Sequence, residues 1–271
     1  MARIFQHPFT TGEMPMNNAE TQPRLALGDR PIGHAPLTNM SLMLQTLMDC
    51  RESENPSARM GVFNGFSGYG KTIAAGFAAA RTGAIYVSAT RLWTQKSLLE
   101  AIAEELGIAK LERSAPRIFR QVVDQLNLAP VDMIVDEMDY LADKGHVEVL
   151  RDIHDATRIA IVMIGEEALP SKLQRWERFA NRILVTTPAQ PASVEDALQL
   201  RDHYCHRIQI ADDLAELFRV RCRGITRRIV NNLQAAQRAA TAEGVSEIDA
   251  AWWGNRPIAT GDVQVRRRES V

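Results

Sequence analysis

The sequence predicts a doubly wound α/β fold: a parallel five-stranded sheet flanked by helices, followed by a small helical domain. Two observations predict it. Five short apolar runs alternate with longer helical patterns over the first two thirds of the chain, and no further strand-like run follows Pro188 and Pro191. Parallel strands buried on both faces read as continuous Val and Ile runs, and the intervening helices supply the crossovers between them.

The expected elements follow one another in a regular order. A helix starts at Thr38, where Thr38 or Asn39 can cap it. The expected strands are 60–64, 84–88, 131–136, 159–164 and 183–186, and the helices between them are 72–81, 95–106, 115–126 and 148–156. Helices 194–206, 211–223 and 226–243 make up an all-helical C-terminal part, in which Gly224 separates two helices and Gly244 ends the third.

These patterns divide the chain into four segments. Residues 1–35 carry prolines, glycines and polar residues without periodicity, which indicates an extended or partly ordered arm. Residues 36–187 form the expected α/β domain and residues 188–255 the helical domain. Residues 256–271 form a tail that contains the basic run Arg266 to Arg268.

The composition is that of an ordinary globular protein, with 45% apolar and 24% charged residues among 271. No apolar run approaches the roughly 18 residues that span a bilayer, and residues 1–6 lack the apolar stretch of a signal peptide. We therefore expect a cytoplasmic protein without a membrane partner. Cys50, Cys205 and Cys222 lie far apart without metal-ligand spacing, so we expect reduced thiols.

The net charge of -1 conceals an asymmetry along the chain. Residues 1–170 contain 16 basic and 21 acidic residues, whereas residues 171–271 contain 16 basic and 12 acidic residues. A basic C-terminal third is compatible with binding nucleic acid or an acidic partner, and equally with an ordinary solvated surface.

The strongest motif is Gly65-Phe66-Ser67-Gly68-Tyr69-Gly70-Lys71-Thr72, which matches the phosphate-binding pattern G-x-x-x-x-G-K-[ST] between a predicted strand and a predicted helix. Glycines let successive backbone N–H groups point at phosphates, Lys71 adds a cation, and the Thr72 hydroxyl serves Mg²⁺. The residues expected to bind ATP are Gly65, Ser67, Gly68, Tyr69, Gly70, Lys71 and Thr72.

A second motif is the apolar strand 131–136, which ends in the adjacent carboxylates Asp136 and Glu137. We expect Asp136 to bind ATP-associated Mg²⁺ together with Thr72, and Glu137 to orient or deprotonate the attacking water. An acidic pair at the start of a loop is common, but its position after the phosphate-binding loop, with room for a strand between them, favours this function.

A phosphate-binding loop, an Asp-Glu strand end and a helical C-terminal domain together resemble the AAA+ ATPases over residues 38–244. The resemblance implies ATP hydrolysis in a homo-oligomer and a C-terminal lid domain. It also implies an arginine that reaches the neighbouring subunit's site, for which Arg178 is the first choice and Arg175 the second. Gly224-Ile225-Thr226-Arg227 resembles the lid motif whose arginine contacts the γ phosphate, so Arg227 is expected there and Arg228 is its alternative.

One departure from the AAA+ pattern concerns the end of the fourth strand, where the family usually has a polar residue such as Asn or Thr. This chain reads Ile164-Gly165-Glu166-Glu167. Glu166 is a candidate for that place, but a carboxylate repels the γ phosphate unless a cation screens it. We therefore expect hydrolysis to be slow or to need a partner.

A narrower resemblance is to the transposition regulators typified by the phage Mu B protein and to the related ExeA-type ATPases. It is carried by residues 64–72, by Tyr86-Val87-Ser88-Ala89-Thr90 with residues 98–107, and by Asp136-Glu137-Met138-Asp139-Tyr140-Leu141. It implies an ATP-dependent ring or helical filament that binds double-stranded DNA with little sequence preference and delivers it to a transposase. Arg91, Lys96 and Lys144 are the candidate DNA contacts.

Two alternatives remain open on the sequence alone. One is another AAA+ machine, such as a helicase loader or a secretion-linked ATPase, that acts on a protein partner. The other is a nucleotide-dependent scaffold whose hydrolysis is vestigial.

Overall fold

The computed structural model describes residues 37–261, so the arm predicted for residues 1–35 and the arginines 266–268 lie outside the described residues. The α/β part contains α1 (Thr38–Glu52), β1 (Met60–Asn64), α2 (Lys71–Thr82), β2 (Ile85–Ser88), α3 (Gln95–Glu105), α4 (Ala115–Leu128), β3 (Met133–Asp136), α5 (Met138–Asp143), α6 (Glu148–Thr157), β4 (Ile161–Gly165), α7 (Leu169–Leu173), α8 (Glu177–Ala180) and β5 (Ile183–Pro188). The C-terminal part contains α9 (Val194–Tyr204), β6 (Gln209–Ile210), α10 (Asp212–Arg221), α11 (Thr226–Glu243), β7 (Glu247–Ile248) and α12 (Ala250–Trp253).

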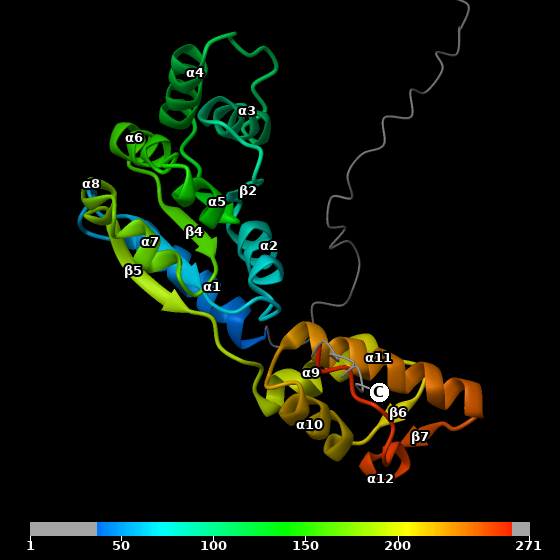
Figure 1. Ribbon diagram of the computed structural model, residues 1–271. Coiled ribbons are helices and arrows are strands. Elements are labelled where there is room, and N and C mark those ends of the chain that lie inside the picture. Colours follow the sequence, from blue (N-terminus) through cyan, green and yellow to red (C-terminus); the bar gives the residue numbers. More distant parts are fainter. Residues whose placement is uncertain (1–36, 262–271) are drawn as a thin grey trace, which may run out of the picture. The chain divides into compact units, whose positions relative to one another are not determined.

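The five main strands form one parallel sheet in the order β2-β3-β4-β1-β5, which confirms the predicted fold class (Figure 1). Strand β4 lies between β1 and β3, the two strands that lead into the sequence motifs. The register pairs Asn64 with Gly165 and Ser88 with Asp136. The carboxyl ends of neighbouring strands therefore meet along one edge of the sheet, where ligands bind in open α/β folds.

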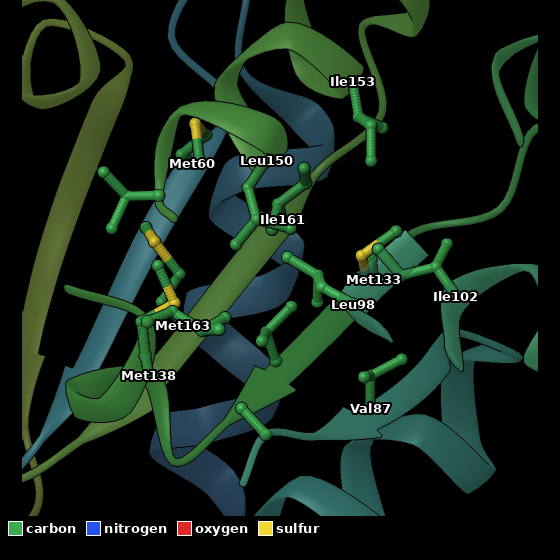
Figure 2. Packing of buried hydrophobic residues seen from close by; sticks show 14 of the residues in the cluster. Met60, Val87, Leu98, Ile102, Met133, Met138, Leu150, Ile153, Ile161 and Met163 are labelled. Atoms are coloured by element: carbon green, nitrogen blue, oxygen red, sulfur yellow. The ribbon is translucent and has the colours of Figure 1, made fainter. Parts of the chain in front are cut away.

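Alternate strand residues point to opposite faces of the sheet, and the central strands β1, β3 and β4 are buried on both faces. Met60, Met133, Ile161 and Met163 belong to an apolar cluster that includes residues of α3, α4 and α6. Figure 2 shows Leu98, Ile102, Leu150 and Ile153 from those helices beside these strand residues. Phe63, Ile134, Val162 and Ile164 belong to a second cluster with α1 and α2 on the other face. This burial explains the continuous apolar runs in the sequence.

The C-terminal part has an apolar core of its own, with Leu214, Phe218, Ile229, Leu233 and Trp253 among its buried residues. The prediction of an all-helical domain is wrong in one respect, because β6 and β7 pair as a two-stranded parallel sheet. Two-residue strands carry no alternating pattern, so periodicity cannot reveal them. The domain boundaries at residues 187 and 255 stay predictions.

The predicted cap of α1 is also wrong. Leu37 precedes the helix, and no side chain caps it. The backbone N–H and the hydroxyl of Thr38 donate instead to Asp196 Oδ1, over 2.8 and 3.1 Å. The Asn39 amide nitrogen donates to the carbonyl oxygens of Tyr69 and Gln190, each over 2.8 Å. Both polar side chains serve long-range contacts rather than the helix terminus.

The three cysteines are free and buried. Burial raises the pKa of Cys50 to about 12 and that of Cys205 to about 11, so both thiols stay protonated near neutral pH. Within residues 37–261, no helix combines the length and the apolar character that crossing a lipid bilayer requires.

Candidate functional site

The segment from Gly65 to Thr72 connects the end of β1 to the first turn of α2. Gly68 and Gly70 have φ angles of 87° and 84°, in the left-handed region that favours glycine. The chain turns sharply here, and the first N–H groups of α2 have no acceptor within the helix. Backbone donors arranged in this way bind anions such as phosphate.

The Lys71 ammonium group lies over the same loop. Its Nζ donates to the carbonyl oxygens of Gly65, over 2.5 Å, and Phe66, over 3.0 Å. Burial lowers the pKa of Lys71 below its ordinary value, and the nearby carboxylate of Asp136 opposes that shift. The amine is therefore held next to the loop donors, where it can contact an anion.

Asp136 ends β3 with 3% of its surface exposed, and its carboxylate accepts three hydrogen bonds. Thr72 Oγ1 and the Tyr86 hydroxyl donate to Oδ2 over 2.8 and 2.9 Å, and the Glu137 backbone N–H donates to Oδ1 over 2.7 Å. The buried carboxylate is thus held in place by donors from three different parts of the chain. The structure thus brings Thr72 and Asp136 together. Their oxygens are suitable to bind Mg²⁺ directly or to accept hydrogen bonds from its water molecules.

Glu137 follows β3 directly and is exposed, so water reaches it. Its φ angle of 56° is unusual for a residue other than glycine, and it marks a sharp turn between β3 and α5. Partial burial raises the pKa of Glu137 above its ordinary value, and the charges of Asp136 and Asp139 add to the shift. A carboxylate with a raised pKa accepts a proton more readily, as a general base must.

Gly165 occupies the end of β4, where the resemblance to AAA+ ATPases predicts a polar side chain. A Cβ atom on Gly165 would lie 2.3 Å from Asp139 Oδ2, so the Asp139 carboxylate fills that space. Asp139 is 6% exposed, accepts the Glu166 backbone N–H over 2.7 Å, and forms an ion pair with Lys172 over 3.0 Å. The Glu166 side chain is exposed. Asp139 and Lys172 are absent from the sequence predictions.

The start of α11 contacts the phosphate-binding loop. The Arg227 backbone N–H donates to the Gly68 carbonyl oxygen over 3.1 Å, and a Cβ on Gly68 would lie 2.8 Å from Ile225 Cγ2. The Arg227 side chain is exposed next to this contact. The Arg228 guanidinium group lies elsewhere, within 3 Å of where a Cβ on Gly261 would be. This geometry favours Arg227 over Arg228 as the arginine nearest the loop.

The two arginines proposed to act on a neighbouring subunit lie on the segment between α7 and the middle of α8. Arg175 and Arg178 are both exposed, whereas the adjacent Phe179 is fully buried. Phe179 therefore anchors the segment and leaves the arginine side chains at the surface. The structure contains one chain, so the trans role of Arg178 stays a prediction.

The three candidate DNA contacts differ in their surroundings. Lys144 Nζ donates to the backbone carbonyl oxygens of Arg91 and Trp93, which ties the loop after β2 to the end of α5. Lys96 forms an ion pair with Glu100 over 3.3 Å. The side chain of Arg91 is exposed and has no such contact within residues 37–261. The structure brings Arg91 and Lys144 together, and two of the three cations already have protein partners.

Comparisons with known proteins concern this same part of the chain. Residues 54–173 match the family described as the AAA domain. Cdc6p from Pyrobaculum aerophilum is similar in structure, with a TM-score of 0.59 and 17% identity over 80% of this chain and 66% of that protein. The fold is that of an AAA+ ATPase core.

Two proteins from Aeropyrum pernix share this AAA+ core. The ORC1 protein, solved in complex with DNA, gives a TM-score of 0.56 and 20% identity, covering 79% of this chain and 63% of that one. The ORC2 protein, solved in ADPNP-ADP complexes, gives 0.59 and 15%, covering 77% and 62%. The chain thus spans less than two thirds of the length of these proteins. Comparison with curated protein sequences gives no significant match.

Two further residues contact the site and are not among the site residues predicted from the sequence. Tyr86 reaches Asp136 from the neighbouring strand β2, and Asn39 holds the Tyr69 carbonyl oxygen from α1. In the sequence, Tyr86 looks like one more apolar strand residue, and Asn39 looks like a helix cap. A polar group within an apolar pattern is the local indication that either residue has a partner elsewhere.

Proposed function

We propose that the protein binds ATP together with Mg²⁺ and hydrolyses it to ADP and phosphate. One observation carries the proposal: Thr72, at the end of the phosphate-binding loop, is hydrogen-bonded to the buried carboxylate of Asp136, and Glu137 follows at once. The glycine-rich turn, Lys71 and these oxygens fit a triphosphate with its divalent cation. The similarity to an ORC2 protein in ADPNP-ADP complexes supports the same ligand class.

In this proposal the chain's own groups have distinct functions. The loop N–H groups and Lys71 bind the β and γ phosphates, while Thr72 and Asp136 hold the cation. When bound, Mg²⁺ neutralises the charge that develops on the phosphate oxygens. Glu137 orients the attacking water and takes up its proton, because it is exposed and has a raised pKa.

Two arginines complete the proposed site. Arg227 contacts the γ phosphate of its own subunit, since its backbone already touches the loop at Gly68. Arg178 reaches the site of the next subunit in a homo-oligomeric ring or helical filament, because it is exposed on an anchored segment. Cations placed there stabilise the charge of the transition state.

We further propose that nucleotide binding drives association with double-stranded DNA, which the assembly presents to a transposase. The Mu B-like motifs support this task, and the similarity to an ORC1 protein solved in complex with DNA supports DNA as the partner. Arg91, Lys96 and Lys144 are the proposed contacts. Phosphate contacts repeated in every subunit give affinity with little base recognition.

A second candidate function is that of an AAA+ machine acting on a protein partner, such as a helicase loader. Lys96 is paired with Glu100, and Lys144 donates to backbone carbonyl oxygens. These contacts favour the protein-partner function, because a cation that already has a partner binds a phosphate less strongly. A third candidate is a scaffold with vestigial hydrolysis, which the glycine at the end of β4 favours.

Hydrolysis is tested by replacing Glu137 with Gln, which keeps the shape of the side chain and removes the base. We expect nucleotide affinity within about twofold of wild type and turnover lower by about 10²- to 10³-fold. Glu105→Gln, on an exposed residue at the end of α3, is the matched control. Equal turnover in Glu137→Gln and wild type would refute the assignment of the base.

DNA association is tested by filter binding of random-sequence duplex DNA with and without ATP, at several salt concentrations. We expect retention only with ATP, and an affinity that falls steeply as salt rises, by about 10³- to 10⁵-fold between 50 and 200 mM if six to ten phosphates are contacted. Arg91→Ala should reduce the slope of that dependence. ATP-independent or absent retention would favour the protein-partner function.

A further inference from the structure

Tyr86 is fixed by its ring and by its hydroxyl group. The ring packs against the apolar cluster formed with α1 and α2. The register pairs Tyr86 with Ile134 and Ser88 with Asp136. Asp136 is therefore the diagonal neighbour of Tyr86 on the adjacent strand, within reach of a long aromatic side chain. The hydroxyl meets Asp136 Oδ2 at 2.9 Å.

The acceptor positions of Asp136 are nearly all occupied. An ionised carboxylate offers about four lone-pair positions on its two oxygens. Thr72 and Tyr86 both donate to Oδ2, and the Glu137 N–H donates to Oδ1. The remaining position on Oδ1 is the one left for a water molecule of a hydrated cation. The direction of that position depends on the two hydroxyl groups, because they set the orientation of the carboxylate.

The two hydroxyl groups differ in what they do when a cation is bound. The Thr72 oxygen lies at the start of α2, beside the loop, and is the one predicted to coordinate Mg²⁺. The Tyr86 oxygen belongs to the neighbouring strand, and the Tyr86 ring packs against the apolar cluster formed with α1 and α2. When Thr72 adjusts to the cation, Tyr86 therefore keeps Oδ2 satisfied and the carboxylate in place.

We infer that Tyr86 is a positioning residue for the magnesium site, which acts through Asp136 and sets the cation dependence of nucleotide binding. The inference rests on the proposed function, and it adds a residue from β2 to a site otherwise built from β1, α2 and β3. If Tyr86 only packed in the core, its ring alone would matter, and phenylalanine at this position would leave the cation dependence unchanged.

The test compares wild type and Tyr86→Phe as full-length chains, with a fluorescent ATP analogue as the probe. The affinity for the analogue is measured in EDTA, and the Mg²⁺ concentration for half-maximal binding is then measured by titration. We expect the affinity in EDTA to change by less than about twofold, and the Mg²⁺ midpoint to rise on the order of tenfold, as loss of one hydrogen bond to a charged group predicts. Tyr140→Phe, on α5, is the control and should leave both values unchanged.

A double-mutant cycle with Asp136→Asn separates positioning from a general loss of stability. If Tyr86 acts through the carboxylate, Tyr86→Phe moves the Mg²⁺ midpoint no further in the Asp136→Asn chain. An unchanged or lowered midpoint in Tyr86→Phe alone, or equal losses with and without Mg²⁺, would overturn the inference. If wild type itself takes up no analogue with Mg²⁺, the proposed function is overturned and the inference falls with it.

Discussion

At the scale of single residues, Gly165 marks the place where this chain differs from the AAA+ pattern. The space for a side chain there belongs to the carboxylate of Asp139, which is held by the Glu166 N–H and by Lys172. The negative charge of Asp139 contributes to the raised pKa of Glu137, in addition to that of Asp136. The polar group next to the end of β4 is therefore the Asp139 carboxylate from α5, and Lys172 is its counter-ion.

Gly165→Ala should destabilise the protein by about 1–3 kcal/mol, because the new Cβ would lie 2.3 Å from Asp139 Oδ2 and 2.7 Å from Leu169 Cδ2. The φ angle of Gly165 is not in the left-handed region, so backbone strain adds nothing. Urea unfolding monitored by circular dichroism measures the change. In an Asp139→Ala background the same substitution should cost less, and an equal cost would show that Asp139 does not fill the space.

At the scale of elements, helix α1 connects the phosphate-binding loop to the C-terminal part of the chain. Asn39, 7% exposed, donates to the Tyr69 and Gln190 carbonyl oxygens and accepts the Gln190 N–H over 2.8 Å. Thr38 reaches Asp196 at the start of α9. The helix that precedes the first motif thus fixes both the loop and the segment after β5.

Asn39→Ala should lower the free energy of unfolding by about 1–3 kcal/mol, because it removes the hydrogen bonds of the Asn39 amide to backbone groups of Tyr69 and Gln190. It should also weaken nucleotide binding, since Tyr69 belongs to the loop. Thermal unfolding and nucleotide titration measure the two effects. Asn181→Ala, an exposed amide, is the control, and similar results for both variants would contradict the connecting function of Asn39.

The sequence predicted the main elements well because their patterns are local. The five strands start within two residues of the predicted positions, since each begins with an apolar run, and α11 has the predicted bounds. The helices α5, α7, α8 and α12 have six residues or fewer, too few for a helical period to be recognised.

The candidate site was predictable only in part, for the same reason. The loop and the Asp136-Glu137 pair are contiguous motifs, so their places at strand ends follow from the sequence. The contacts of Tyr86 with Asp136 and of Asn39 with Gln190 join residues 50 and 151 positions apart, and no local pattern encodes them. The contacts of Lys144 with Arg91 and Trp93 likewise depend on tertiary packing, whereas Lys96 pairs with Glu100 four residues along the same helix, a local spacing.

At the scale of the whole molecule, the assembly prediction concerns two variants that are each inactive alone. Arg178→Ala keeps an intact Glu137, and Glu137→Gln keeps an intact Arg178. If Arg178 acts on the neighbouring subunit, mixing the two chains should restore part of the ATP turnover, because some sites then contain both groups. Steady-state phosphate release from equimolar mixtures measures the restoration.

The matched control mixes Glu137→Gln with a Lys71→Ala/Arg178→Ala chain, in which the sites with an intact Glu137 lack the loop cation. Its turnover should stay at background. If the first mixture gives only the average of its two components, Arg178 either acts within its own subunit or has no part in hydrolysis.

The contact between Gly68 and the start of α11 can be tested by substitution at residue 68. A Cβ atom on Gly68 would lie 2.8 Å from Ile225 Cγ2, and the Arg227 backbone N–H donates to the Gly68 carbonyl oxygen. A methyl group at position 68 would press against Ile225 and would also strain the backbone, because the φ angle of Gly68 is 87°. Replacing Ile225 with Ala would relieve the contact but not the backbone strain. Comparing Gly68→Ala with Gly68→Ala/Ile225→Ala would therefore separate the contact between the loop and the start of α11 from the conformation of the loop itself.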